Sequence, residues 1–457
     1  LKELADNLKK QTKTTPVEIK PTTKKLYYSL TRPQMVFWKA EKKLPSGFFN
    51  VVSIVRFNEK ICLKSLNKAF EDLIQRHESL RITFLNKGSK VVQKINDGFE
   101  IKINSSVSLE NYDGLAFQKK ISKIFKNERK KSFNLEKNFL VRAKLIKLRG
   151  GKYILIIVVH HLVFDFKSKY ILSKDLELIY DYYVGKIKKH PFPKDKNILK
   201  YHDYLDWENK NKFKKQEDYW LKIFSSKDLP YLKLPFSSFK PEIKDKNFCN
   251  FRYLFLNKEQ LINIKKICNS YNLTYFDFFF GVLSFFLYNL TYSQEIPIGT
   301  TVDLRKTKSM ENLIGMLMST IIIINKIDTE KSFLSHLLNF KENILEAINN
   351  ADVPFSYLVE NNNLIKGKDR KLMQVFFEVF YYPEELFLNR KEEEIKKEFS
   401  SKLNFSKYTP FDISQEVFVA KDVLKLQLIF NSNFFDQKEI DSLFKKYGLL
   451  LNKLIKK

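Results

Sequence analysis

The chain has 457 residues, enough for two or three folding units at about 150 residues each. Its 81 Lys and Arg residues against 52 Asp and Glu give a formal net charge of +29. The positive residues are scattered, are mostly Lys, and accompany no zinc-finger, helix-turn-helix or RNA-binding signature. Composition therefore favours an acidic protein partner over nucleic acid.

The three cysteines, Cys62, Cys249 and Cys268, are too widely spaced for a disulfide framework or a metal-ligand cluster. This predicts a reducing, cytoplasmic environment and no metal site. The longest apolar stretch, Tyr275 to Leu290, contains an Asp and is shorter than the ~20 residues that cross a bilayer, so it predicts a buried helix and no membrane anchor. Residues 1–25 lack a secretory signal and are expected to be a linker inside a longer polypeptide.

Alternating strand and helix patterns along the chain predict an α/β protein. In residues 26–185, Leu66, Phe70, Leu73 and Ile74 fall on one helical face, and His77 lies near the end of that helix. The run Tyr153 to Val159 is continuously apolar and is expected to form a central strand buried on both faces. A helix capped by Ser168 and ending near Gly185 is predicted to follow it.

Residues 186–215 are basic at first, contain two prolines and lack periodicity, so they are expected to connect two lobes. Residues 216–457 then predict a second α/β lobe. Its expected strands are Phe248–Leu256, Met316–Asn325, Met373–Tyr381 and Leu424–Asn431, and its expected helices include Lys258–Tyr271 and Thr274–Leu290. Asp436 and Glu439 have the spacing of a capping box for the last helix.

Two adjacent histidines, His160 and His161, follow the predicted central strand in the stretch "HHLVFDF", with Asp165 four residues after the second. Imidazole has a reference pKa of about 6.5, so it can accept and return a proton near neutral pH. Loops at strand ends commonly carry reactive groups. The alternative is that both rings are packed, hydrogen-bonded ends of a buried strand.

The histidine stretch is one of several segments that together resemble condensation domains of nonribosomal peptide synthetases or of hybrid polyketide–peptide assembly lines. In family order these are "SLTRPQMVFW" from Ser29, "RHESLRITF" from Arg76, "HHLVFDF", "YHDYLDW" from Tyr201, "IGMLMST" from Ile314, "ADVPFSYLV" from Ala351, "MQVFFEV" from Met373 and "PFDIS" from Pro410. The resemblance implies two chloramphenicol-acetyltransferase-like lobes, arranged as a V-shaped pseudo-dimer with a central tunnel.

The resemblance also implies an activity: transfer of an acyl or peptidyl thioester from one carrier protein to an amine or hydroxyl on a second. No cofactor would be bound intrinsically; the phosphopantetheine arms belong to the acidic donor and acceptor carriers, beside flanking synthetase or polyketide modules. The excised domain is expected to be monomeric. His161 would be the base or the orienter of the nucleophile, and His160 would be structural.

In the same comparison Asp165 is expected to brace the loop through Arg305 of "GTTVDLR", with Arg81 as further structural support. The chain departs from the family pattern at Phe166, where Gly is usual, and at Ser319, where Asn is usual. Both are expected on the acceptor side of the tunnel. A Phe would narrow the space that Gly leaves open.

Three functions stay open at this point. The first is an active condensation domain. The second is a condensation-like domain without catalysis that gates, docks or recruits other enzymes. The third is a free-standing acyltransferase that uses coenzyme A. The complete His160, His161 and Asp165 set argues against the second, and the absence of an initiator Met argues against the third.

Overall fold

The computed structural model describes residues 18–98, 100–192, 198–225, 230–235, 249–362, 373–383, 390–400 and 409–456. Helices and strands alternate through these residues, which confirms the predicted α/β class. Two compact units divide the chain: one comprises Thr14–Phe213 with Asp303–Met318, and the other Lys214–Val302 with Ser319–Lys457. The segment Asp303–Met318 thus belongs with the first unit, whereas the prediction placed it in a lobe spanning 216–457.

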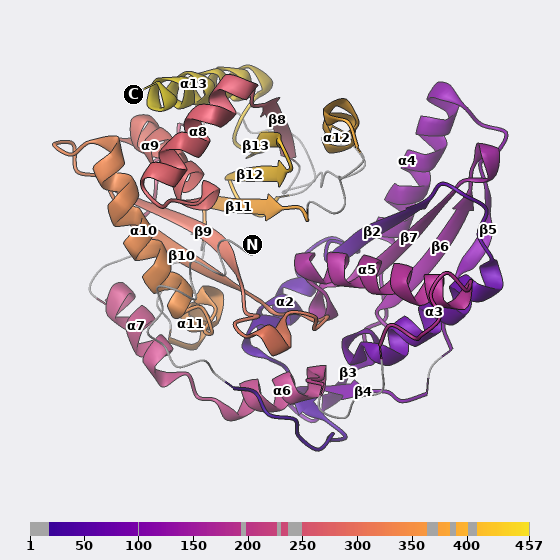
Figure 1. Cartoon of the computed structure of the whole chain (residues 1–457). Helices are drawn as coiled ribbons and strands as arrows, with labels where there is room; N and C mark the ends of the chain where they lie inside the picture. Colours follow the sequence, from indigo (N-terminus) through magenta and orange to yellow (C-terminus); the bar gives the residue numbers. More distant parts are fainter. Residues whose placement is uncertain are drawn as a thin grey trace. The chain divides into compact units, whose positions relative to one another are not determined.

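The first unit is built on two small sheets (Figure 1). A three-stranded sheet has the order β1-β4-β3 and a four-stranded sheet the order β2-β7-β6-β5. Their strands are β1 (Tyr28–Ser29), β2 (Asn50–Phe57), β3 (Ile82–Lys87), β4 (Lys90–Ile95), β5 (Asn104–Ser108), β6 (Val141–Lys147) and β7 (Tyr153–His160). The helices are α2 (Arg32–Glu41), α3 (Leu63–Arg76), α4 (Gly114–Lys130), α5 (Phe166–Tyr183) and α6 (Tyr201–Lys210), with short 3-10 helices η1 (Glu78–Arg81), η2 (Arg149–Gly151), η3 (His161–Val163) and η4 (Lys308–Met310).

Strand β7 is internal to its sheet, as its apolar sequence predicted, and pairs antiparallel with both β2 and β6. Because strand side chains alternate, Leu155, Ile157 and Val159 enter the core shared with α3 and α5. Helix α4 packs on the opposite face of β2 and β7 (Figure 1). The predicted strand therefore has helices on both faces and ends at His160.

Two helix predictions in this unit have different outcomes. Helix α3 buries Leu66, Phe70, Leu73 and Ile74 on one face and ends at Arg76, with His77 as its C-cap, as predicted. The predicted cap at Ser168 is wrong, because α5 begins three residues earlier: Asp165 is its N-cap, and its carboxylate accepts a hydrogen bond from the Ser168 amide. That helix ends before Gly185, where the backbone turns to a φ of +80°.

The second unit contains one six-stranded sheet of order β10-β9-β11-β12-β13-β8. Its strands are β8 (Cys249–Phe255), β9 (Glu295–Asp303), β10 (Met318–Lys326), β11 (Val375–Tyr381), β12 (Ile413–Ala420) and β13 (Val423–Asn431). The helices are α7 (Lys214–Ser225), α8 (Lys258–Ser270), α9 (Tyr275–Thr291), α10 (Phe333–Asn349), α11 (Phe355–Asn362), α12 (Glu392–Phe399) and α13 (Gln437–Ile455). The four predicted strands match β8, β10, β11 and β13 within two residues, apart from Phe248, which lies outside the described residues.

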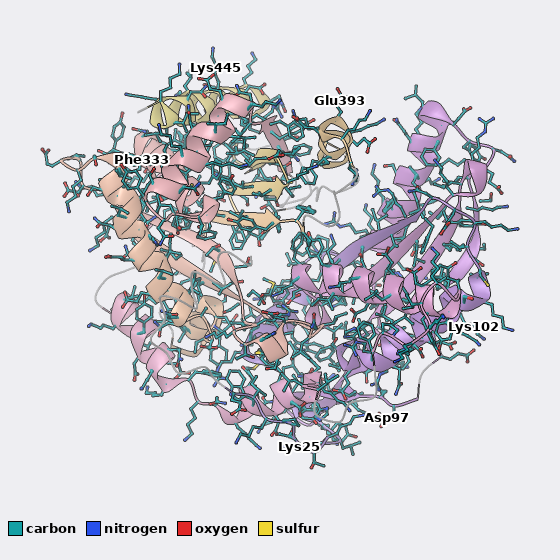
Figure 2. The ribbon with its side chains drawn as sticks, in the orientation of Figure 1. Lys25, Asp97, Lys102, Phe333, Glu393 and Lys445 are labelled. Carbon is teal, nitrogen blue, oxygen red and sulfur yellow. The ribbon has the colours of Figure 1, made fainter. Side chains whose placement is uncertain are left out.

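The apolar run from Tyr275 forms α9, which is almost wholly buried, and Asp436 with Glu439 forms the predicted capping box of α13. Across the described ranges, no single helix combines the length and apolarity that crossing a membrane requires; α8 and α9 meet that criterion only as a pair, bent by 106°. Charged side chains such as Lys102 and Lys445 project outward from the units (Figure 2).

Of the predicted linker 1–25, residues 1–17 lie outside the described residues. The predicted connection 186–215 contains α6, and the described part of it belongs to the first unit up to Phe213. Part of that segment, 193–197, also lies outside the described residues. The mutual arrangement of the two lobes and the tunnel between them remain predictions.

Candidate active site

His160 is a buried residue at the end of β7, only 2% exposed. Its amide donates to the Leu140 carbonyl at 2.9 Å, and its Nδ1 accepts from the Leu162 amide at 3.3 Å. Its Nε2 lies 3.4 Å from a carboxylate oxygen of Glu41. Nε2 makes no hydrogen bond among the described residues, but the ring is enclosed by protein groups, an arrangement that suits the structural role expected for this histidine.

His161 follows as the first residue of η3 and is half-buried. Its amide donates to the Phe49 carbonyl at 2.8 Å, and its ring centroid lies 4.9 Å from that of Phe37. Its Nδ1 is buried and has no hydrogen-bond partner among the described residues. Burial lowers the pKa of His161 below its ordinary value of 6.5, so the imidazole is neutral at pH 7 and able to accept a proton.

Asp165 is buried and accepts five hydrogen bonds. Its Oδ1 accepts from the Ser168 amide at 2.8 Å, the Ser168 hydroxyl at 2.7 Å and Arg305 Nη2 at 3.0 Å. Its Oδ2 accepts from Arg305 Nη1 at 2.7 Å and from the Leu317 amide at 3.1 Å. A carboxylate offers about four lone-pair sites, so these donors occupy all of them.

The ion pair that the resemblance implied between Asp165 and Arg305 is present and bidentate. Arg305 also donates to the Leu313 carbonyl and to Asp303 at 2.9 Å each. Burial alone would lower the pKa of Arg305, but the charges of Asp165 and Asp303 outweigh it and raise that pKa. The guanidinium is therefore permanently charged and fixes the loop that follows His161.

Sequence reasoning assigned no role at this site to Ser168, which is fully buried. Its hydroxyl donates to Asp165, accepts from Arg305 Nη2 at 3.1 Å, and accepts from the Gly315 amide at 3.1 Å. The spacing Asp-x-x-Ser could have indicated it, because an N-cap carboxylate reaches the residue three positions later.

Phe166 is the first residue of α5 and is half-buried. Its ring packs edge-on against Tyr170 at a centroid distance of 5.2 Å, and the Lys169 ammonium lies 5.3 Å from the ring centroid. These neighbours lie within the first five residues of the same helix. The partial exposure of the ring argues against a fully buried, core-filling role for Phe166.

The two remaining predicted residues lie elsewhere. Arg81 is buried in η1 and donates to the carbonyls of Ile74 at 3.1 Å, Gln75 at 3.2 Å and Asn96, which ties the end of α3 to the segment after β4. Ser319 lies on β10 in the other unit, and its buried hydroxyl has no hydrogen-bond partner in the part of the chain that the structure describes. The structure brings neither of them into the hydrogen-bonded group around Asp165.

The sequence matches a known protein family over most of its length. The Condensation domain family matches residues 24–457. The chain belongs to the condensation-domain family. Within the described part of the chain, no three His, Cys, Asp or Glu side chains are grouped as metal ligands would be.

The curated relatives are peptide synthetases. The chain is 24% identical over its whole length to gramicidin S synthase 2 of Aneurinibacillus migulanus, of which it spans 10%. It is 26% identical over 92% of its length to bacitracin synthase 1 of Bacillus licheniformis, of which it spans 8%. The condensation domain thus corresponds to a small part of each of these relatives.

The solved structures with a similar fold are of several kinds. An X-domain from teicoplanin biosynthesis, in complex with OxyB, matches with a TM-score of 0.78 and 18% identity over 97% of this chain and 96% of that one. The epimerization domain from the third module of tyrocidine synthetase B matches with a TM-score of 0.73, 15% identity, and 96% and 99% coverage. The first condensation domain of the calcium-dependent antibiotic synthetase matches with a TM-score of 0.71, 14% identity, and 94% and 97% coverage. These matches establish the fold, and the activity must be argued from the site.

Proposed function

We propose that this chain is an active condensation domain. It transfers an acyl or peptidyl group, held as a thioester on the phosphopantetheine arm of one carrier protein, to an amine or hydroxyl held on a second. The observation that carries this proposal is the combination of a neutral His161, directly after β7, with an Asp165 held by five hydrogen bonds.

In the proposed reaction the neutral nucleophile attacks the thioester carbonyl carbon. The bond to the nucleophile forms, the tetrahedral oxyanion collapses, and the carbon–sulfur bond breaks to release the thiol of the donor arm. His161 Nε2 orients the nucleophile or takes its proton and passes it to the departing thiolate, so protons and electrons balance. A positioned base contributes typically 10²–10⁴-fold in rate, and holding both arms together contributes the rest through proximity.

Asp165 has a positioning role in this proposal. Because its lone pairs are already occupied, it cannot also accept a hydrogen bond from His161 in the manner of a catalytic triad. It fixes the start of α5 through Ser168 and the loop through Arg305, and so sets the direction of the preceding histidine.

An intact-mass assay with an acyl-loaded donor carrier and an aminoacyl-loaded acceptor carrier tests this function. Wild type should move the acyl mass from donor to acceptor. His161→Ala should lower transfer at least 100-fold, in keeping with loss of a base, while its circular-dichroism spectrum stays that of wild type. The matched control is His190→Ala, since His190 is half-buried and bound to Asp72 and Phe192 in the same unit. Equal transfer by both variants would remove His161 from the chemistry.

A second function is favoured by the match to the X-domain, which was solved in complex with OxyB. In that case the chain would dock another enzyme without forming a bond. The same assay separates the two functions, because a docking domain would transfer no acyl mass under any loading of the carriers. Transfer from an acyl-coenzyme A donor added in place of the carriers would instead indicate a free-standing acyltransferase.

A further inference from the structure

Helix α4 has two chemically different faces, and its inward face is fixed to the sheet. Ile121, Phe125 and Glu128 are its buried residues. Glu128 pairs with Lys144 and, at 3.4 Å, with Arg142, both on β6. The only acidic side chain of the helix is therefore already neutralised by the sheet beneath it.

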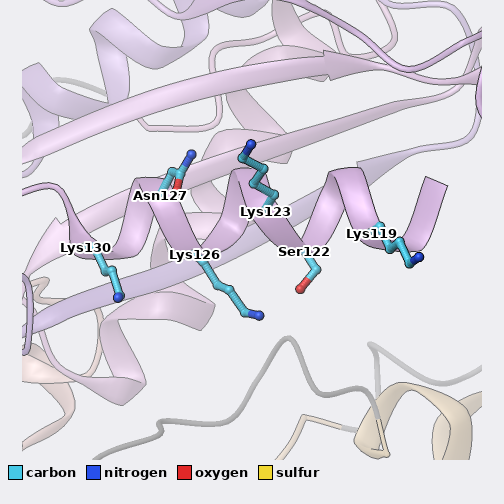
Figure 3. A pocket seen from close by; sticks show the side chains of 6 residues that line it. All are labelled: Lys119, Ser122, Lys123, Lys126, Asn127 and Lys130. Atoms are coloured by element: carbon cyan, nitrogen blue, oxygen red, sulfur yellow. The ribbon is translucent and has the colours of Figure 1, made fainter. Parts of the chain in front are cut away.

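The outward face of α4 carries four exposed lysines, Lys119, Lys123, Lys126 and Lys130. With Ser122 and Asn127 they line a pocket along the helix (Figure 3). Their spacing of four, three and four residues places them on one side over about 16 Å of helix. We call these four residues the lysine face.

The lysine face is uncompensated, considering the described residues. No carboxylate in the described ranges lies within ion-pair distance of any of its four ammonium groups. Some exposed lysines on other segments are paired, as Lys186 is with Glu59 and Lys214 with Asp218, whereas the exposed lysines of α13 have no carboxylate partner among the described residues. Because like charges at these helical spacings repel, the lysine face weakens the isolated helix, and a negatively charged partner would relieve the repulsion.

The composition of this face favours protein over nucleic acid. Leu115, 75% exposed, lies four residues before Lys119 and extends the face with an apolar end. The aromatic residues of this helix, Phe117 and Phe125, fall on other sides of it than the four lysines, and Phe125 is buried, so the face offers no platform for base stacking. Arg, the residue suited to bidentate phosphate contacts, occurs in this helix once, as the half-buried Arg129. Four ammonium groups beside the exposed Leu115 match a protein helix that carries carboxylates and one apolar side chain.

The last turn of α4 is tied to the strand that lies beside the histidines. Asn50 Nδ2 donates to the carbonyls of Arg129 at 2.7 Å and of Lys131 at 2.8 Å. Asn50 is the register partner of His160 across β2 and β7. Gly47 allows this close approach, because a Cβ there would overlap the Arg129 carbonyl oxygen. A partner bound along α4 would thus be held by a segment anchored next to the candidate active site.

We propose that the lysine face of α4 docks an acidic helix of a carrier domain that delivers a thioester to His161. This deepens the proposed function and rests on it for the identity of the carrier. Binding by such a face is electrostatic and speeds encounter, so it should depend on salt and on these four positions more than on the total charge of the chain.

Two variants of the full chain with the same net charge provide the test. The first changes Lys119, Lys123, Lys126 and Lys130 to Gln, which has a similar helix propensity. The control changes four exposed lysines of α13 to Gln: Lys438, Lys445, Lys446 and Lys453. The probes are a fluorescein-labelled helical peptide with Glu at i, i+4, i+7 and i+11 and a Leu at one end, its Glu→Gln analogue, an acidic holo-carrier domain, a short random duplex DNA and phosphatidylserine vesicles.

At low salt the α4 variant should bind the Glu peptide and the holo-carrier about tenfold more weakly than wild type, while the α13 control binds as wild type does. The difference should vanish near ~1 M salt, where the Debye length is about 3 Å. In the mass assay the α4 variant should show a raised KM for the carrier and an unchanged kcat. Equal weakening by both variants, or tighter binding of DNA or vesicles than of the Glu peptide, would overturn the proposal.

The outcomes also separate this proposal from the function it rests on. Salt-dependent carrier binding through α4 without any acyl transfer would contradict the proposed function and support the docking surface. Acyl transfer with identical KM values in both variants would support the proposed function and contradict the docking surface. His161→Ala should bind the carrier as wild type does, since it removes no charge from the lysine face.

Discussion

At the scale of single residues, the proposed function gives the buried carboxylate of Asp165 a positioning role and no part in proton transfer. Burial of an ion is costly unless donors surround it, and here five donors do so. The same contacts make the charge essential to the fold. Loss of activity after substitution of Asp165 would therefore report on position as much as on chemistry.

Substitution of Asp165 or Arg305 should lower stability as well as the rate of transfer. Asp165→Asn and Arg305→Gln each leave an uncompensated buried charge or polar group, which costs about 3–5 kcal/mol in the free energy of unfolding. The control is Lys167→Gln, which removes a partly exposed pair with Asp303 and should cost less than about 1 kcal/mol. Urea unfolding of the three variants measures this, and a brace is ruled out if all three match wild type.

Phe166 should affect the choice of acceptor more than stability. Its ring is half-buried against Tyr170, so Phe166→Gly should cost little more than the ~1 kcal/mol of a helical Gly. Phe164→Ala, which removes a fully buried ring two residues away, should cost about 3–5 kcal/mol. A panel of loaded acceptor carriers, read by intact mass, should show broadened use by Phe166→Gly. An unaltered panel together with a large loss of stability would contradict this view.

At the scale of helices and strands, local patterns predicted what local physics decides. The apolar run of β7, the amphipathic α3 and the capping box of α13 are properties of adjacent residues, and all three are confirmed. The start of α5 was missed because two capping residues three positions apart, Asp165 and Ser168, compete in sequence. The carboxylate prevails because Arg305 and Leu317 also bind it, and those partners are invisible in a local pattern.

The candidate site was predictable only in part for the same reason. His161, His160 and Asp165 follow one strand and could be grouped from the sequence. The carboxylate of Glu41 near His160, the Phe37 ring at His161 and the amide of Leu317 come from distant segments. The pairing with Arg305 was expected from a family resemblance, since no periodicity relates positions 140 residues apart.

The contact between η1 and α6 should make stability depend on pH. His202 Nδ1 lies 2.9 Å from Glu78 Oε2, and both residues are buried. Burial would lower the pKa of His202, but the hydrogen bond and charge of Glu78 outweigh it and raise that pKa above 6.5. Burial would raise the pKa of Glu78, yet His202 lowers it below 4.5.

The sign of the pH effect follows from these two shifts. The His202 contribution is fully present below pH 6.5 and is lost as pH rises through the raised folded pKa; the Glu78 contribution is present above pH 4.5 and is lost on acidification. The melting temperature of wild type minus that of His202→Gln should therefore be largest between these values and shrink above them. A difference that grows with rising pH would contradict the pairing.

At the scale of the whole molecule, the first unit is assembled from non-contiguous sequence. Asp303–Met318 joins β9 to β10 of the second unit's sheet, yet it supplies Arg305, Gly315 and Leu317 to the contacts around Asp165 and Ser168. A defect in this segment should therefore disturb the first unit.

Gly315→Ala tests that assignment in the full chain. A Cβ at Gly315 would overlap the Tyr201 ring, so the substitution should cost about 1–3 kcal/mol through overpacking. Hydrogen exchange should rise in α5 and α6, while α9 and α13 keep their protection. Gly448→Ala is the matched control, because a Cβ there meets open space. Increased exchange confined to β9 and β10 would argue that Gly315 serves the second unit instead.

The late position of Arg305 in the sequence also delays the folding of the first unit during synthesis. Asp165 leaves the ribosome 140 residues before its guanidinium partner, which at 5–20 residues per second is a delay of roughly 7–28 s. During that interval the carboxylate can be hydrogen-bonded only by Ser168 and water, and the turn after His161 lacks the ion pair with Arg305. The first unit can therefore complete its fold only after translation has passed well into the second. A chain released by a ribosome that stalls before Arg305 would contain both histidines but would lack the ion pair that fixes the loop after His161.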